Sequence, residues 1–220
     1  MLSHDSAVPM DRPHETGGPW SEAPMEAGTW ARDLVRRQSL ATPTDTLRGM
    51  FLRGTLETIR ELGDEALVER CREACAHEDF VELFSYPVRL QLQLMSVALE
   101  ALAARHGSCE QALRLLGRKA LGDFLASKSG KMLLVVGGGE ASRLLLNAPT
   151  GYRVSTSYGE HSLRWLGPTS CRWTMKRQFM PPPFEEGLLA GLLENTRARN
   201  VRVVGRQTGV LDSEYDISWE

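Results

Sequence analysis

The fold is decided by the C-terminal stretch of the chain, residues 151–220, which reads GYRVSTSYGEHSLRWLGPTSCRWTMKRQFMPPPFEEGLLAGLLENTRARNVRVVGRQTGVLDSEYDISWE. Three short segments of it, residues 152–158, 161–166 and 170–176, alternate bulky apolar side chains with polar ones. A period of two is typical of half-buried strands. The stretch therefore predicts three strands at its beginning.

A helix and two more strands are predicted to follow. Three prolines at positions 181–183 interrupt strand pairing and favour a helix start, because proline is tolerated in the first helical turn. The helix spans about residues 184–197. Its apolar face is expected to consist of Phe184, Leu188, Leu189, Leu192 and Leu193. Residues 201–203 and 214–219 then alternate again. This order predicts a curved antiparallel sheet with a helix on one face.

Helices are predicted for the part of the chain before residue 151. From Trp30 onward, apolar side chains recur every three or four residues. Residues 42–45 read as a helix start, with a threonine cap, a proline and an acidic residue in the first turn. This helix would end at Gly63, since glycine is common just past a helix end.

Further helices are predicted from spacing and caps: residues 64–76, a helix ending near Arg105, residues 109–126 capped by Ser108 with Gln111, residues 131–136, and a short turn at 140–147 before Pro149.

Three glycines at 137–139 suggest a phosphate-binding loop, but such a loop follows a strand and ends in a lysine beside serine or threonine. The glycines are more simply a helix stop.

The chain is predicted to hold one α+β domain behind a tail. Residues 1–28 are rich in proline, glycine and acidic residues and poor in aliphatic ones, so they predict a disordered tail. Residues 29–220 predict a single α+β domain. Its N-terminal multi-helix half, residues 29–150, is expected to pack on the sheet-plus-helix half, residues 151–220.

Composition narrows the class of function. The net charge of -2 gives no overall attraction to nucleic acid. The longest apolar run, residues 132–136, is far too short for a membrane span, and the N-terminus does not read as a signal peptide. The four cysteines do not resemble a disulfide framework, which favours reduced thiols. These features predict a cytoplasmic protein without a membrane span or a nucleic-acid partner.

Candidate metal and catalytic residues form no complete site. Cys71, Cys75 and His77 lie close in sequence, but no second cysteine–histidine pair completes a tetrahedral set, and buried packing is the usual role of such cysteines. Cys109, Cys171 and His161 are the available pieces for nucleophilic catalysis. His161 is placed on a turn between two strands. The sequence therefore predicts no metal, no cofactor and no enzyme. A catalytic alternative requires a cleft in which His161 or a cysteine meets a charged partner and has a shifted pKa.

Two features of the predicted strands leave alternatives open. Arginines and lysines fall mostly on the strand faces opposite the apolar ones, namely Arg153, Arg164, Arg172, Lys176, Arg177, Arg202 and Arg206. That face either meets an acidic partner or a phosphate group, or is simply solvated. Trp165, Trp173 and Trp219 either line a ligand pocket or belong to the core.

Several stretches together carry a resemblance: TPTDTLRGMF at 42–51, YGE at 158–160 and GVLDSEYDISW at 209–219. They resemble a large paralogous family of uncharacterised proteins of about this length found in myxobacteria. The resemblance covers the chain from about Trp30 to the end. It brings no biochemical activity that can be transferred to these residues.

A more distant likeness concerns the helix order and the segment FEEGLLAGLLE at 184–194, followed by two strands. They are similar to the heme-nitric-oxide/oxygen-binding domains and to the vinyl-reductase-type small-molecule-binding domains, with the vesicle-tethering subunits of the same fold beyond them. The likeness implies a heme-nitric-oxide-binding-like fold in which the helical half and the sheet enclose a ligand.

The functional residues of these groups do not carry over. The iron-ligating histidine of the heme group precedes the first sheet strand, where this chain reads GEASRL at 139–144. The tyrosine-serine-arginine clamp for the heme propionates falls across Phe179, Pro181 and Pro183. The vinyl-reductase group often has cysteines around its last two strands, and residues 201–220 contain none. The resemblance therefore implies a ligand other than heme.

The sequence thus predicts a non-catalytic sensory or regulatory module that binds a small apolar ligand between the helical half and the sheet, without heme. The pocket candidates are Trp165, Trp173 and Phe179. The alternative is a protein-interaction or dimerisation scaffold, a homodimer or a complex with another protein, whose core is filled by its own side chains. Exposed leucines or valines on helices before Gly130 would favour that alternative.

Overall fold

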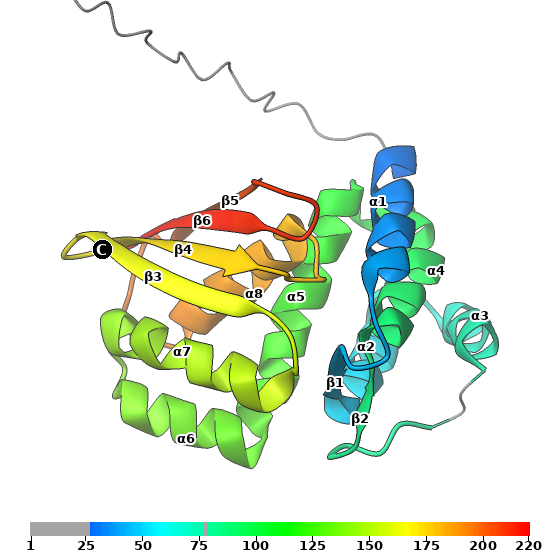
Figure 1. The fold of residues 1–220 in the computed structure, drawn as a ribbon, viewed down its shortest axis with the longest axis horizontal. Helices are drawn as coiled ribbons and strands as arrows, with labels where there is room; N and C mark the ends of the chain where they lie inside the picture. Colours follow the sequence, from blue (N-terminus) through cyan, green and yellow to red (C-terminus); the bar gives the residue numbers. More distant parts are fainter. Residues whose placement is uncertain (1–26, 77–78) are drawn as a thin grey trace, which may run out of the picture.

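The computed structural model describes residues 27–76 and 79–220, and Figure 1 shows their arrangement. The helices are α1 (Ala27–Leu40), α2 (Gly49–Leu62), α3 (Glu65–Cys75), α4 (Val88–His106), α5 (Cys109–Ala126), α6 (Lys128–Gly137), α7 (Ala141–Ser155) and α8 (Pro182–Glu194). The strands are β1 (Thr46–Arg48), β2 (Ser85–Pro87), β3 (Glu160–Gly167), β4 (Ser170–Lys176), β5 (Arg202–Gln207) and β6 (Ser213–Ser218). The predicted α+β class is confirmed.

The main sheet is antiparallel, with the strand order β3-β4-β6-β5. Trp173 of β4 lies opposite Tyr215 of β6, and Cys171 lies opposite Ile217. All four side chains are buried on the face that packs on α8, since alternate residues of a strand point to the same face. The four strands predicted over residues 161–219 and the helix after the prolines are therefore confirmed.

Cap chemistry placed several helix ends correctly. The backbone N–H of Gly63 bonds back to the carbonyl of Ile59 at the end of α2. The hydroxyl of Ser108 accepts from the N–H of Gln111 at the start of α5. Gly138 ends α6 in the left-handed conformation with φ of 58°, which glycine adopts without strain. The glycines at 137–139, the first of which is the last residue of α6, are the helix stop that the sequence predicts.

The strand predicted over residues 152–158 is wrong, because α7 continues through Pro149 to Ser155. Its buried residues are spaced by three and four along the chain: Ala141, Leu144, Leu145, Ala148 and Ser155. The alternation near Tyr152 is too short to outweigh this longer helical period. The proline removes one backbone donor, and packing against α6 holds the helix together across it. The predicted boundary at residue 150 thus falls inside a helix.

The helix start predicted over residues 42–45 is also wrong. These residues form a turn in which the carboxylate of Asp45 accepts from the N–H and the hydroxyl of Thr42, both at 2.7 Å. The chain then forms strand β1, which pairs with β2 in an antiparallel ribbon. Helix α2 begins only at Gly49. An aspartate that bonds back to a turn is a common alternative to a helix cap.

Helices α5 and α8 join the two halves of the molecule. In Figure 1 they lie between the main sheet and the helices α1 and α4. A Cβ added to Gly117 of α5 would lie 1.9 Å from the carbonyl oxygen of Phe184, and one added to Gly187 of α8 would lie 2.0 Å from that of Arg114. The two helix backbones therefore touch, and glycine is required at both positions.

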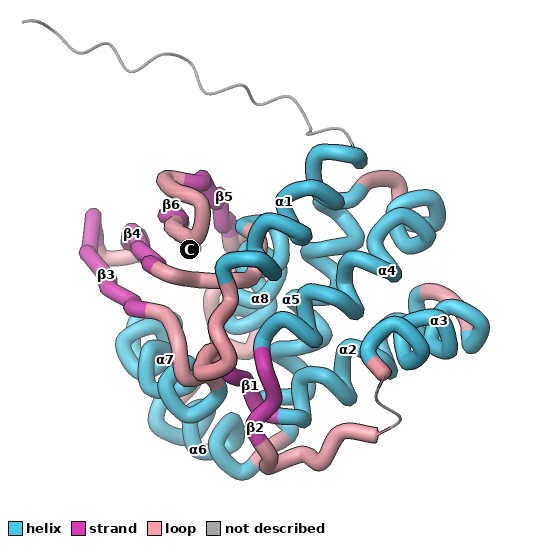
Figure 2. The backbone as a smooth tube through the Cα atoms, turned by 45° about the vertical axis from the view of Figure 1, so that its right-hand side comes forward, coloured by secondary structure: helices cyan, strands magenta, loops and turns pink. Residues whose placement is uncertain are grey.

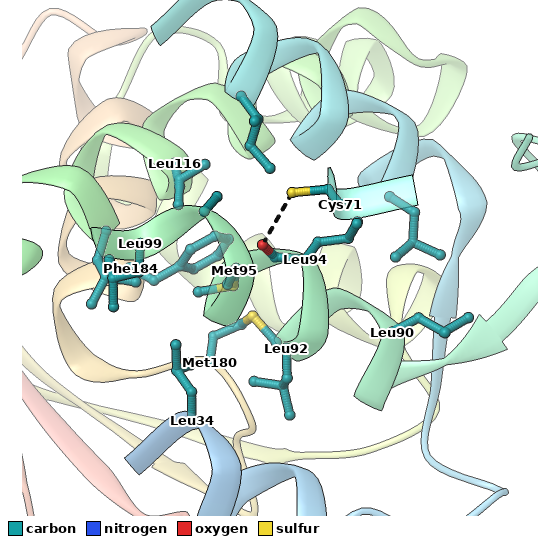
Figure 3. Close-up of a cluster of buried hydrophobic side chains, with 14 of the residues drawn as sticks. Leu34, Cys71, Leu90, Leu92, Leu94, Met95, Leu99, Leu116, Met180 and Phe184 are labelled. Carbon is teal, nitrogen blue, oxygen red and sulfur yellow. Dashed lines mark hydrogen bonds between the residues drawn. The ribbon is translucent and has the colours of Figure 1, made fainter. Parts of the chain in front are cut away.

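The helical half has its own apolar core, part of which Figure 3 shows. Leucines and Met95 of α4 pack there against Leu34 of α1, Leu116 of α5 and Phe184 of α8. Cys71 of α3 is fully buried, and its thiol lies 3.7 Å from the carbonyl oxygen of Leu94. Phe184 and Met180 bring the C-terminal half into this core, and Figure 3 labels both side chains there. Figure 2 shows the backbone of α8 beside that of α5.

The predictions of an N-terminal tail and of no membrane span are tested only for the described residues. The predicted tail, residues 1–28, lies outside the described residues except for its last two positions, where α1 begins. Among the helices of the described part, none is both long and apolar enough to cross a membrane. That residues 29–220 form a single domain stays a prediction.

Candidate functional site: a cavity with a buried glutamate

A cavity of about 80 Å³ lies where the two halves meet. Its wall comes from β1, α2, α4, α5 and α6 on one side and from α7, α8 and the loops around Tyr158 and Gln178 on the other. Most of the lining is apolar: Leu47, Phe51, Ala120, Leu121, Phe124, Leu133, Ala148, Gly151, Met180, Phe184, Leu188 and Leu192. The polar residues in the wall are Gln91, Tyr152, Ser155, Thr156, Tyr158, Gln178 and Glu185. None of these residues belongs to β3–β6, so helix α8, rather than the sheet itself, forms the C-terminal side.

Glu185 is the acidic residue of this wall. It lies in the first turn of α8 and is only 1% exposed. Its Oε2 accepts a hydrogen bond of 2.5 Å from the hydroxyl of Tyr152 on α7. Burial raises the pKa of Glu185 to about 7, although the bond from Tyr152 and the charge of Arg37 act in the opposite direction. A carboxyl group that titrates near neutrality inside a cavity is a typical feature of functional sites.

Tyr152 connects Glu185 to the sheet. Its ring stacks on His161 with 4.1 Å between the ring centroids. The Nδ1 of His161 accepts from the indole N–H of Trp173 at 3.2 Å. His161 lies in β3 rather than on a turn, so its predicted position is wrong. Burial, with a contribution from Arg153, lowers the pKa of His161 to about 4, so the ring is neutral at pH 7.

Gln91 places an amide group in the opposite wall. The residue lies on α4 and is 1% exposed. Its Nε2 donates to the hydroxyl oxygen of Thr55 on α2 at 2.6 Å. Its Oε1 has no hydrogen-bond partner within the described part of the chain. Because buried polar atoms are normally bonded, this oxygen marks a place where a ligand or a water molecule is expected.

Arg37 of α1 fixes the loop that leads into α8. The guanidinium is almost fully buried and forms an ion pair with Asp33 at 2.6 Å. It also donates to the carbonyl oxygens of Gln178 and Met180, at 3.2 and 3.3 Å. Gln178 and Met180 line the cavity, and the same loop ends at the first turn of α8. A buried arginine thus positions this part of the wall.

None of the three predicted pocket residues lies in the cavity wall, and two of them, Trp173 and Phe179, lie behind it. Trp173 and Phe179 are fully buried, and they pack against two lining residues, Tyr152 and Tyr158, with ring centroids 5.9 and 5.0 Å apart. Trp165 is 38% exposed and packs edge-on against Trp219. That any of these three contacts a ligand stays a prediction.

The sequence reasoning missed Glu185, Gln91 and Arg37. In sequence, Glu185 is one of two acidic residues in a first helical turn, a position where carboxylates are usually exposed and favourable. Gln91 is part of an alternation of apolar and polar residues in α4. This pattern does not show whether a polar side chain faces a cavity, the core or solvent. No local signal separates a buried arginine from a surface one.

Two arginines on the outer face of the sheet, Arg172 and Arg206, are paired. Arg172 forms two hydrogen bonds with Asp216 across β4 and β6, at 2.7 and 3.0 Å. Arg206 of β5 bonds to Asp216 at 3.0 Å and also to Glu214. These carboxylates neutralise much of the positive charge of Arg172 and Arg206, which favours a solvated structural face over a phosphate site.

The cysteines lie away from the cavity. All four are buried, and burial raises the pKa of the thiols of Cys71, Cys75 and Cys171 to about 11 and that of Cys109 above its usual value. Thiols with raised pKa values are poor nucleophiles. The other member of the candidate metal group, His77, lies outside the described residues. The group of cysteine and histidine that catalysis would need is not brought together at the cavity.

A groove between α6 and α7 adjoins the cavity. It has a volume of about 380 Å³ and is lined mainly by apolar side chains, including Met132, Val136 and Val154. Phe124, Leu133 and Gly151 line both the groove and the cavity. The ring of Phe124 lies 3.3 Å from where a Cβ of Gly151 would be, so a side chain at position 151 would press on this ring.

Comparison with solved structures defines the class of fold. The chain is similar to an H-NOX protein from S. oneidensis in the Fe(II)NO ligation state, with 14% identity, a TM-score of 0.61 and coverage of 79% of this chain and 99% of that one. It is also similar to the Fe(II) unliganded H-NOX protein from K. algicida, with 13% identity, a TM-score of 0.57 and coverage of 79% and 97%. A third similar structure is an oxygen-binding H-NOX domain related to soluble guanylate cyclases, with 13% identity, a TM-score of 0.57 and coverage of 79% and 95%.

The chain is therefore an α+β protein with the H-NOX-like fold, as the sequence predicts. Residues 40–220 match the family described as "Protein of unknown function (DUF2378)", and the chain belongs to this family. The predicted membership in a family of uncharacterised proteins is confirmed. A search of the curated proteins gave no match.

The cavity does not have the size of a heme site. Heme iron is held by a histidine, cysteine, methionine or tyrosine ligand. The wall contains no histidine or cysteine and the hydroxyl of Tyr152 is bonded to Glu185, so Met180 and Tyr158 are the residues of a suitable type in it. The cavity is also smaller than the engineered cavity of about 150 Å³ that holds one benzene molecule, so a porphyrin exceeds it. That this protein works without heme stays a prediction.

Proposed function

We propose that this protein is a non-catalytic sensory or regulatory module that binds a small, mostly apolar ligand, other than heme, in the cavity between its two halves. The observation that carries the proposal is the cavity itself, which is lined by both halves and mainly by apolar side chains. Ligand sites are commonly apolar cavities with a few converging polar groups.

The fold, and the contribution of both halves to the cavity wall, support the proposal. The similar solved structures include proteins described with Fe(II)NO or with oxygen, so this arrangement of helices and sheet binds small molecules elsewhere. A ligand that contacts α4 and α8 together would alter the packing of the two halves. Such a contact is what a binding event needs in order to change the structure.

Thermal unfolding in the presence of a library of small lipophilic compounds tests this function. A ligand that binds the folded state raises the Tm. Ala148→Leu places a larger side chain in the cavity wall and is expected to abolish the shift. Ala126→Leu on the exposed side of α5 is the matched control and is expected to retain it. Native mass spectrometry of the purified protein then identifies any compound that it carries.

Two results would contradict the proposal. In the first, no compound of the library shifts the Tm of the wild-type protein. In the second, Ala148→Leu and Ala126→Leu respond to the compounds as the wild type does, so that binding takes place elsewhere.

A protein-interaction or dimerisation scaffold is the second candidate. The favouring observation is apolar exposure before Gly130: Val35 of α1 is 58% exposed, and in the loop before β2 Leu83 and Phe84 are 73% and 63% exposed. Light scattering after size exclusion decides between the two. A dimer that Leu83→Ser dissociates supports the scaffold, and a monomer at high concentration supports the ligand-binding module.

A further inference from the structure

We propose that the ligand of this cavity carries a hydrogen-bond donor, a hydroxyl or an amine, on a small apolar body, and that Gln91 or Glu185 accepts from it. The inference rests on the proposed function and names its class of ligand. It follows from two polar groups that the fold buries in the cavity wall without satisfying them fully.

Gln91 supplies a neutral acceptor. The bond from Nε2 to Thr55 fixes the amide plane, and Oε1 lies buried without a partner among the described residues, in a side chain that lines the cavity. Leaving a buried carbonyl oxygen unbonded costs about 1–3 kcal/mol. A donor on a bound molecule removes that cost, whereas an apolar or acceptor-only molecule does not.

Glu185 supplies the second acceptor. Its neighbour Glu186 pairs with Arg114 at 2.7 Å, but among the residues that the structure describes no lysine or arginine forms an ion pair with Glu185. The bond from Tyr152 occupies Oε2. An ammonium group placed against this carboxylate would be its counter-ion, and a hydroxyl would donate to it.

The charged and titratable groups around Glu185 come from several elements. Tyr152 on α7, Tyr158 after α7 and Tyr215 on β6 all have pKa values raised by burial, so they are neutral at physiological pH. Arg37 on α1 acts on Glu185 through its charge. Glu185 is therefore the group whose charge changes near neutral pH in this cluster, and a carboxylate ligand would add a second negative charge to it.

The size of the cavity limits the body of the ligand. At about 80 Å³ the space is smaller than the engineered cavity of about 150 Å³ that takes benzene. A branched body of three carbons with one substituent is of suitable size, since it has fewer non-hydrogen atoms than benzene. Such molecules are available with matched substituents that differ mainly in hydrogen bonding.

The test uses four probes of nearly equal shape: 2-propanol, isopropylamine, acetone and isobutane. Their dissociation constants are measured by NMR titration of the full-length protein. 2-Propanol is expected to bind about three- to tenfold more tightly than acetone, as one additional satisfied hydrogen bond predicts. The affinity for isopropylamine is expected to increase as the pH rises through about 7, when Glu185 ionises.

Two variants test which residue accepts the hydrogen bond from each probe. Gln91→Leu is expected to reduce the preference for the alcohol over the ketone without weakening isobutane binding. Glu185→Gln is expected to abolish the pH dependence of amine binding. Gln93→Leu is the matched control for Gln91, because Gln93 also lies on α4 but donates to the carbonyl of Ala74 and does not line the cavity.

The outcomes separate this inference from the proposed function. If isobutane binds but the ketone binds as tightly as the alcohol or more tightly, the donor inference is overturned and the ligand-binding function stands. The same holds if Gln91→Leu and Gln93→Leu alter the four affinities alike. If no probe binds, while the lipophile library still shifts the Tm, the inference again fails alone. If neither the probes nor the library bind, both fail.

Discussion

Asp216 and Glu185 show two opposite environments for a carboxylate in one molecule. Asp216 lies on the outer face of the sheet, where Arg172 and Arg206 both donate to it. The bond from Arg172 is the main reason that the pKa of Asp216 is lowered. Glu185 lies in the cavity with a tyrosine as its hydrogen-bond donor, and burial raises its pKa to about 7. The outer carboxylate is satisfied by the protein, whereas the inner one is not.

The difference between Asp216 and Glu185 indicates which of the two carboxyl groups has a structural role and which has a functional one. Paired charges on a sheet surface need no explanation beyond solubility and strand pairing. A buried carboxyl without a cationic partner destabilises the fold unless something else compensates for it. We infer that the inner site is retained for a role that the outer one does not have. The following predictions test this comparison, from the largest expected effect to the smallest.

The two faces of strand β4 differ most in packing. Trp173→Ala removes a fully buried ring and is expected to lower the free energy of unfolding by about 3–5 kcal/mol. Arg172→Ala, one residue away on the outer face, is expected to cost about 0–1 kcal/mol, since it removes a partly exposed ion pair. Urea denaturation measures both. Equal losses would show that the faces do not differ as described.

Glu185→Gln tests the inner carboxyl through pH. The pKa of Glu185 rises from 4.5 to about 7 on folding, so the folded state binds the proton more tightly. The wild type is therefore expected to lose roughly 3 kcal/mol of stability as the pH rises from about 4.5 to 7. The variant lacks this pH-dependent loss, so its free energy of unfolding is expected to be higher than that of the wild type above pH 7. Glu186→Gln is the control, and it should keep the slope of the wild type.

Tyr152→Phe tests whether the hydrogen bond from Tyr152 contributes to the pKa of Glu185. The lost hydroxyl donates to Glu185 and helps to lower its pKa, so the variant should titrate at a higher pH and lose about 1 kcal/mol of stability. Carbon-13 NMR of the Glu185 carboxyl reads the titration directly. Tyr158→Phe also alters the cavity wall and serves as the control. An unchanged titration in Tyr152→Phe would contradict the hydrogen bond.

Asp216→Asn should show the opposite dependence on pH with a smaller amplitude. Because the pKa of Asp216 is lowered on folding, its contribution is present above the unfolded value of 3.8 and is lost as the pH falls through the folded value. The substitution is expected to cost no more than about 1 kcal/mol at neutral pH, because the side chain is 40% exposed and salt screens it. A larger cost that persists in high salt would contradict this account.

Local patterns predicted much of the fold and little of the site. The strands 161–166 and 170–176 and the helix after the prolines were correct because side-chain period and proline geometry act over a few residues. The misplaced helix start at 42–45 and the strand at 152–158 arose where two local patterns competed. In both places a contact with another element decided the outcome: β1 pairs with β2, which is distant in sequence, and α7 packs on the preceding helix α6.

The amino-acid sequence by itself determined the α+β class, the family and the apolar face of the final sheet, since these depend on periodicity and on recognisable stretches. Only the tertiary structure decided that Glu185 and Gln91 face one cavity and that Arg37 is buried behind its loop. A glutamate, a glutamine and an arginine look the same in sequence whether they are solvated or enclosed. Their chemistry here arises from desolvation, which depends on helices brought together from distant parts of the chain.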